Sequence, residues 1–141
     1  MIVETLLSWS PLDLPLIIQN LDRFMHGVWV TLGLTFLSLA VGGVLAVPLA
    51  IARAARHPVL NPLVWTYTYV FRGTPLLVQT YLLYYGAGQF DFVRKSWLWD
   101  PVLSQAWWCA LIAFTLNTCA YTTELLRGAI LDTPKGEVEA A

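Results

Sequence analysis

A helix that carried residues 106–126 would hold three polar residues on one side, and these are the first candidates for handling a polar solute. With about 100° between successive residues, Asn117, Tyr121 and Glu124 fall within about 60° of one another. The adjoining arc carries the threonines Thr115, Thr118 and Thr122. This face either lines a polar path or makes hydrogen bonds to neighbouring helices, and for the threonines we favour the second. Glu124 has a further alternative, an ion pair with Arg127 one turn later.

The fourth candidate, Arg72, is a charged residue inside a nonpolar stretch. A charge at membrane depth costs at least about 2.5 to 3.5 kcal/mol and normally faces protein or water. The next residues include Gly73 and Pro75, which interrupt a helix and leave backbone carbonyl groups unpaired. Arg72 therefore either donates hydrogen bonds to those carbonyls or forms part of a polar path.

Other kinds of chemistry lack candidate residues. The sequence has no Gly-Lys-Ser/Thr phosphate loop, so this chain is not expected to be an ATPase. His26 and His57 are isolated from each other, and no cluster has metal-ligand spacing. Cys109 and Cys119 are about 15 Å apart along one helix, too far for a disulfide. We expect no catalytic residues, no metal and no cofactor bound by this chain.

The elements that position these candidates are membrane-spanning helices. The composition is 57% hydrophobic and 12% charged, with a mean hydropathy of +0.62, which is unusual for a soluble domain. The net charge is −1 and the sequence has no basic cluster, so nucleic-acid binding is not expected. Residues 27–52 contain no charge and are long enough to cross about 30 Å of hydrocarbon. Further spans are expected at about 63–85, broken near Arg72, and 106–126. Residues 1–26 are expected to form an extracytoplasmic segment with an amphipathic helix in the interface.

The first span carries a small residue at every fourth position. This series is Ser38, Gly42, Ala46, Ala50 and Ala54. A ridge of small side chains lets another helix approach closely. Although Gly and Ala are common in membrane helices, five positions in register favour a packing face.

The distribution of Lys and Arg predicts the orientation. Arg53 and Arg56 follow the first span in a short loop, and Arg127 and Lys135 follow the third. Arg23, Arg94 and Lys95 lie on the opposite side. The positive-inside rule then places the N-terminus outside and the C-terminal end in the cytoplasm.

A short cytoplasmic helix is predicted to begin after the third span. Thr133 and Pro134 have the types expected of an N-cap and a first helical residue. Glu137 and Glu139 follow in the first turns, where the helix dipole favours acidic side chains. The sequence stops at Ala141, barely two turns into that helix, so we expect a C-terminal truncation.

Three segments in order resemble the permease subunits of polar amino-acid ABC importers. They are FRGTPLLVQ at 71–79, NTCAYTTE at 117–124 and GEVEAA at 136–141. The likeness is greatest to the histidine/lysine/arginine/ornithine type. It implies an all-α membrane protein with the type I importer permease fold, which normally has five transmembrane helices and here has three, within residues 27–141.

The resemblance also implies partners and roles. The loop at 133–141 resembles the start of a coupling helix that docks on an ABC ATPase, through Gly136, Glu137, Glu139, Ala140 and Ala141. A second permease subunit, identical or paralogous, and an extracytoplasmic amino-acid-binding protein complete such an importer in the bacterial inner membrane, and its ATPase uses the ATP. Arg72, Asn117, Tyr121 and Glu124 then line or shape the path for the amino acid, and Glu124 would suit a basic one.

Two other functions remain open at this point. The broken second span with Arg72 also suits an ion-coupled secondary transporter or a channel, which the ATP dependence of uptake distinguishes. A non-transporting scaffold needs only the small-residue ridge, and it predicts that replacing Arg72 or Glu124 leaves transport unchanged.

Overall fold

The computed structural model describes residues 18–134, and every regular element in this part of the chain is helical. The longer helices are α3 (Leu21–Ala54), α4 (Leu60–Gly73), α5 (Leu76–Tyr81) and α7 (Ala106–Asp132). Shorter turns lie between α5 and α7, at Leu82–Gly86, Ala87–Gln89, α6 (Asp91–Arg94) and Trp99–Leu103. The chain divides into two units, residues 1–33 and 34–141, and the second unit contains the site described below.

In the first unit, the described residues belong to a helix that continues through Gly27. The Thr31 hydroxyl donates a hydrogen bond to the Gly27 carbonyl at 2.9 Å, as in an uninterrupted helix. We predicted that a separate interfacial helix would end before this glycine, but α3 already begins at Leu21. A single glycine weakens a helix by only about 1 kcal/mol, and the flanking residues are good helix formers. Residues 1–17 lie outside the described part.

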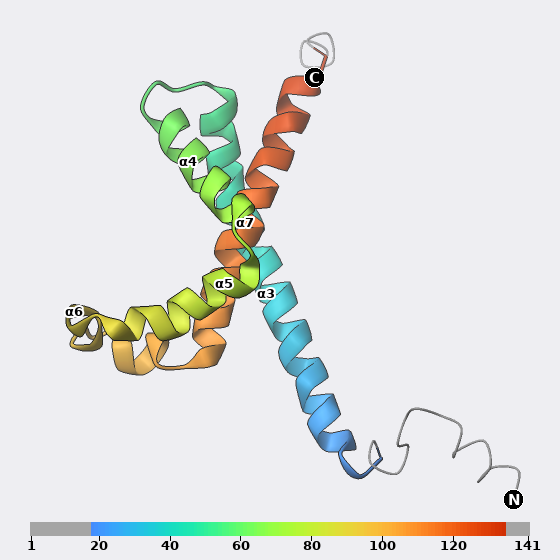
Figure 1. The fold of residues 1–141 in the computed structure, drawn as a ribbon. Helices are drawn as coiled ribbons and strands as arrows, with labels where there is room; N and C mark the ends of the chain where they lie inside the picture. The colour runs from blue at the N-terminus through green and yellow to red at the C-terminus, as the bar shows by residue number, and fades with distance from the viewer. Residues whose placement is uncertain (1–17, 135–141) are drawn as a thin grey trace, which may run out of the picture. The chain divides into compact units, whose positions relative to one another are not determined.

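In the second unit, α4 and α5 pack against α7 (Figure 1). The predicted break in the second span is present. Helix α4 ends at Gly73, Thr74 is extended with φ −109° and ψ 141°, and α5 leads away in a different direction from Pro75. Proline has no N–H to continue the helical ladder, which explains the position of the break.

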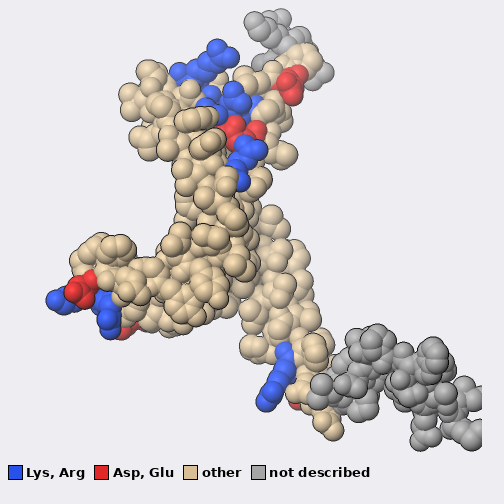
Figure 2. Space-filling view, in the orientation of Figure 1, with Lys and Arg blue, Asp and Glu red and all other residues tan. Residues whose placement is uncertain are grey.

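Within residues 18–134, two helices are long and apolar enough to cross a membrane, α3 and α7. The predicted second span is divided between α4 and α5, each shorter than a bilayer crossing requires by itself. Helix α7 continues to Asp132, beyond the end predicted at residue 126, because Arg127 and Gly128 do not interrupt it. On the face shown in Figure 2, the charged side chains of the second unit gather near the α4–α7 end and around α6, with an uncharged surface between them.

Candidate functional site

The break between α4 and α5 is held by two side-chain amides. The Gln79 amide nitrogen donates to the Phe71 carbonyl at 2.8 Å and lies 3.1 Å from the Thr74 carbonyl. Asn117, from α7, donates to the same Phe71 carbonyl at 3.1 Å and lies 3.4 Å from the Gln79 amide oxygen. The Phe71 and Thr74 carbonyls at the break are therefore paired without a charged side chain.

In the described part of the chain, the Arg72 side chain does not donate hydrogen bonds to the carbonyls of the break, which was one of its two predicted roles. Its guanidinium lies 5.3 Å from the centre of the Tyr121 ring, and Tyr121 donates a hydrogen bond to the Arg72 carbonyl at 3.4 Å. Among residues 18–134 the structure shows no hydrogen bond or ion pair made by the guanidinium itself. A contact with an aromatic face contributes about 0.5 to 2 kcal/mol, less than the cost of an arginine at membrane depth.

Beside these residues there is a hollow between α4 and α7, with a volume of about 350 Å³. We call it the α4–α7 hollow; its lining residues are Trp65, Thr68, Tyr69, Arg72, Gly73, Tyr121 and Glu124. The Trp65 and Tyr69 rings stack on its α4 side, with their centres 5.2 Å apart. Three of the four predicted path residues, Arg72, Tyr121 and Glu124, thus line one cavity, while Asn117 bonds to a carbonyl at the break.

Glu124 belongs to an ion-pair cluster that joins three helices. Its Oε1 atom lies 3.0 Å from Arg53 Nε of α3 and accepts a hydrogen bond from the Thr68 hydroxyl of α4 at 3.0 Å. The predicted pair with Arg127 is also present, but it is longer, at 3.7 Å. Arg53 also donates to the Asn61 side-chain oxygen at 2.6 Å. The Glu124 charge is therefore already balanced inside the protein.

Sequence reasoning missed this role of Arg53, which we had used only to predict orientation. Arg53 is buried, with 8% of its surface exposed. A signal was available, because Arg53 comes three residues after Ala50 and so lies on nearly the same helix face as the small-residue ridge.

The ridge itself is buried. Ser38, Gly42, Ala46 and Ala50 have little exposed surface, while Ala54 is partly exposed. A Cβ atom on Gly42 would lie 2.9 Å from the Thr115 carbonyl oxygen of α7. Glycine therefore allows the α3 and α7 backbones to come this close.

The predicted coupling residues, Gly136, Glu137, Glu139, Ala140 and Ala141, lie outside the described residues. The same is true of the helix that we expected to begin after Pro134.

Comparison with known proteins identifies the family of this chain. A family model described as the binding-protein-dependent transport system inner membrane component matches residues 42–141. The chain is 45% identical over 131 residues to the octopine transport system permease protein of Rhizobium radiobacter, covering 93% of this chain and 53% of that protein. It is 43% identical over 127 residues to the histidine/lysine/arginine/ornithine transport system permease protein of Escherichia coli strain K12, covering 90% and 53%.

A solved structure gives the same result. The crystal structure of an amino acid ABC transporter with histidines matches with a TM-score of 0.76 and 29% sequence identity, over 94% of this chain and 57% of that one. The present chain spans about half the length of the curated relatives it matches.

The matched family consists of inner-membrane transport components, and α3 and α7 are long and apolar enough to cross a membrane. This chain belongs to the family of binding-protein-dependent transport system inner membrane components. The predicted fold class, an all-α membrane protein with the ABC importer permease fold, is confirmed, as is the resemblance to amino-acid permeases.

Proposed function

We propose that this chain supplies part of the membrane permease of an ATP-driven importer of polar amino acids, most of all basic ones. The observation that carries this proposal is the family match over residues 42–141, which includes the broken span and the polar face of α7. Relatives named for octopine transport and for histidine, lysine, arginine and ornithine transport support a nitrogen-rich amino-acid substrate.

The family membership supports a set of partners for this chain. An ABC ATPase subunit hydrolyses the ATP, and this chain itself binds no cofactor or metal. An extracytoplasmic binding protein delivers the amino acid, and a second permease subunit, identical or paralogous, completes the path. Gly136, Glu137, Glu139, Ala140 and Ala141 contact the ATPase subunit in this proposal.

Within the permease, Arg72, Asn117, Tyr121 and Glu124 have two kinds of role. Arg72 and Tyr121 line the α4–α7 hollow, where a polar solute finds both a charge and hydroxyl groups. Asn117 keeps the break in shape, and Glu124 holds the three helices together at the edge of the hollow.

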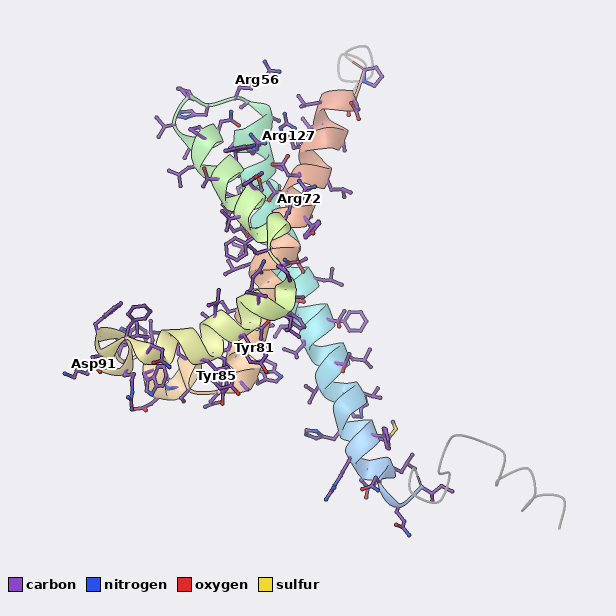
Figure 3. All side chains as sticks on the ribbon, viewed as in Figure 1. Arg56, Arg72, Tyr81, Tyr85, Asp91 and Arg127 are labelled. Carbon is purple, nitrogen blue, oxygen red and sulfur yellow. The ribbon has the colours of Figure 1, made fainter. Side chains whose placement is uncertain are left out.

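The orientation that we propose has the N-terminus outside and the C-terminal end in the cytoplasm. Arg56 and Arg127 support it, because these two basic side chains lie at the same end of the second unit (Figure 3), and basic residues beside membrane spans favour the cytoplasmic side. Arg53 is a weaker guide than the sequence implied, since it is buried in the cluster with Glu124.

Uptake by the complete transporter that contains this chain tests the proposal. Proteoliposomes would hold ATP inside and receive the binding protein with labelled arginine outside. We expect uptake that requires hydrolysable ATP, resists ionophores, and is competed by lysine and histidine but not by glutamate. Uptake driven by an ion gradient without ATP would instead establish a secondary transporter, and no uptake under either condition would favour a scaffold.

A further inference from the structure

Arg72 is placed where a charge needs a partner. It lies twelve residues after Leu60, the first residue of α4, which is about 18 Å along the helix. In the orientation proposed above, with α4 beginning at the cytoplasmic edge of the bilayer, this is near the middle of a hydrocarbon core of about 30 Å. Its side chain is exposed on the wall of the α4–α7 hollow. An arginine at this depth normally faces an anion or a water-filled cavity.

The carboxylate in the lining and two carbonyls at the break are already bonded to other protein groups. The Glu124 carboxylate, the single acidic group in the lining, is bound by Arg53, Thr68 and Arg127. The Phe71 carbonyl accepts from Gln79 and Asn117, and the Arg72 carbonyl accepts from Tyr121. Within residues 18–134, the five N–H donors of Arg72 are therefore left to meet something that enters the hollow.

We propose that Arg72 binds the carboxylate of the transported amino acid in the α4–α7 hollow. This inference rests on the proposed function and assigns one contact within it. A guanidinium presents two parallel donors that match a carboxylate, and a hollow of about 350 Å³ is within the size range of small-molecule sites. The stacked Trp65 and Tyr69 rings offer the remainder of the ligand a surface that also accepts a cation.

The test compares ligands that differ only at the carboxylate. The complete transporter in lipid nanodiscs, without its binding protein, is titrated with arginine, with agmatine, which lacks the carboxylate, and with arginine methyl ester, in which it is neutral. The wild-type protein should bind arginine at least about 30-fold more tightly than either analogue.

Substitutions then test whether Arg72 causes the preference for a free carboxylate. Arg72→Gln should weaken arginine binding about 30-fold and leave agmatine binding unchanged, and Arg72→Lys should fall between the two because an ammonium lacks the paired donors. Arg94→Gln, in the short helix α6, removes the same charge outside the hollow and should change neither ligand.

The inference is overturned if wild type binds arginine and agmatine equally, or if Arg72→Gln weakens both to the same degree, as a purely structural arginine would. If Arg72→Gln does not fold, Arg72→Lys and the wild-type ligand series still decide. If the wild-type transporter shows no ATP-driven uptake, the proposed function is wrong. If uptake occurs and Arg72→Gln keeps the wild-type preference for arginine over agmatine, only this contact is wrong.

Discussion

Removing one partner from the Glu124 cluster should destabilise the helical unit more than removing any exposed charge of the same chain. The side chains of Arg53 and Glu124 are only 10% and 14% exposed, and their atoms are 3.0 Å apart. Removing one partner of a buried ion pair costs about 3 to 5 kcal/mol, because the other charge is left without compensation. In this cluster, losing Arg53 should cost less than losing Glu124, because Glu124 has other partners.

The two single substitutions should therefore differ. After Arg53→Gln, Glu124 still has the Thr68 hydroxyl at 3.0 Å and Arg127 at 3.7 Å, so we expect a loss of about 2 kcal/mol. After Glu124→Gln, two arginines remain close together with no carboxylate between them, and we expect the full loss of about 3 to 5 kcal/mol. The double variant should lose less than the sum of the two single losses.

Reversible unfolding in mixed detergent micelles measures these free energies. Arg56→Gln is the matched control, because it removes the same charge from an exposed side chain just beyond α3 and should change stability by less than about 0.5 kcal/mol. The reasoning is wrong if Arg53→Gln matches the control, if Glu124→Gln is the milder of the two, or if the losses in the double variant simply add.

Three further predictions concern packing, the break and topology. Gly42→Ala should destabilise the protein by about 1 to 3 kcal/mol, because its Cβ would lie 2.9 Å from a backbone oxygen. Gly43→Ala has nothing within 4 Å and should instead stabilise the protein by up to about 1 kcal/mol; thermal unfolding compares the two variants, and equal midpoints would contradict the contact. Gln79→Leu removes the donor to two carbonyls of the break and should lower the unfolding free energy by about 1 to 3 kcal/mol; a stability equal to wild type would show that water or other groups replace it. A cysteine at Ala55 should react with membrane-impermeant reagents only from the cytoplasm and one at Lys95 only from outside, and the reverse pattern would overturn the proposed orientation.

The parts of the fold that local chemistry determines could be predicted from the sequence. Gly73 and Pro75 act on their own backbone, so the break after Arg72 was visible in the order of residues. The ridge containing Gly42 was visible because a four-residue spacing keeps side chains on one helix face. The start of α3 was misplaced, since a lone glycine is a much weaker signal than a proline.

The pairing of charges was not predictable in the same way. Arg53 and Glu124 are 71 residues apart, and no local pattern says that an arginine at the end of one span meets a carboxylate in another. A basic residue beside a span is ordinarily taken to mark the cytoplasmic side. The same limit applied to Arg72, because the sequence did not show that Gln79 and Asn117 already occupy the carbonyls of the break.

These contacts change the electrostatic argument about the substrate. From the sequence, Glu124 was the residue that would attract a basic amino acid. In the structure this one carboxylate is shared by Arg53 and Arg127, so the cluster carries an excess of positive charge and does not attract a cation. Any preference for a basic side chain at the α4–α7 hollow must then come from the aromatic faces of Trp65 and Tyr69 or from the binding protein. Substituting Glu124 should consequently alter stability before it alters substrate preference.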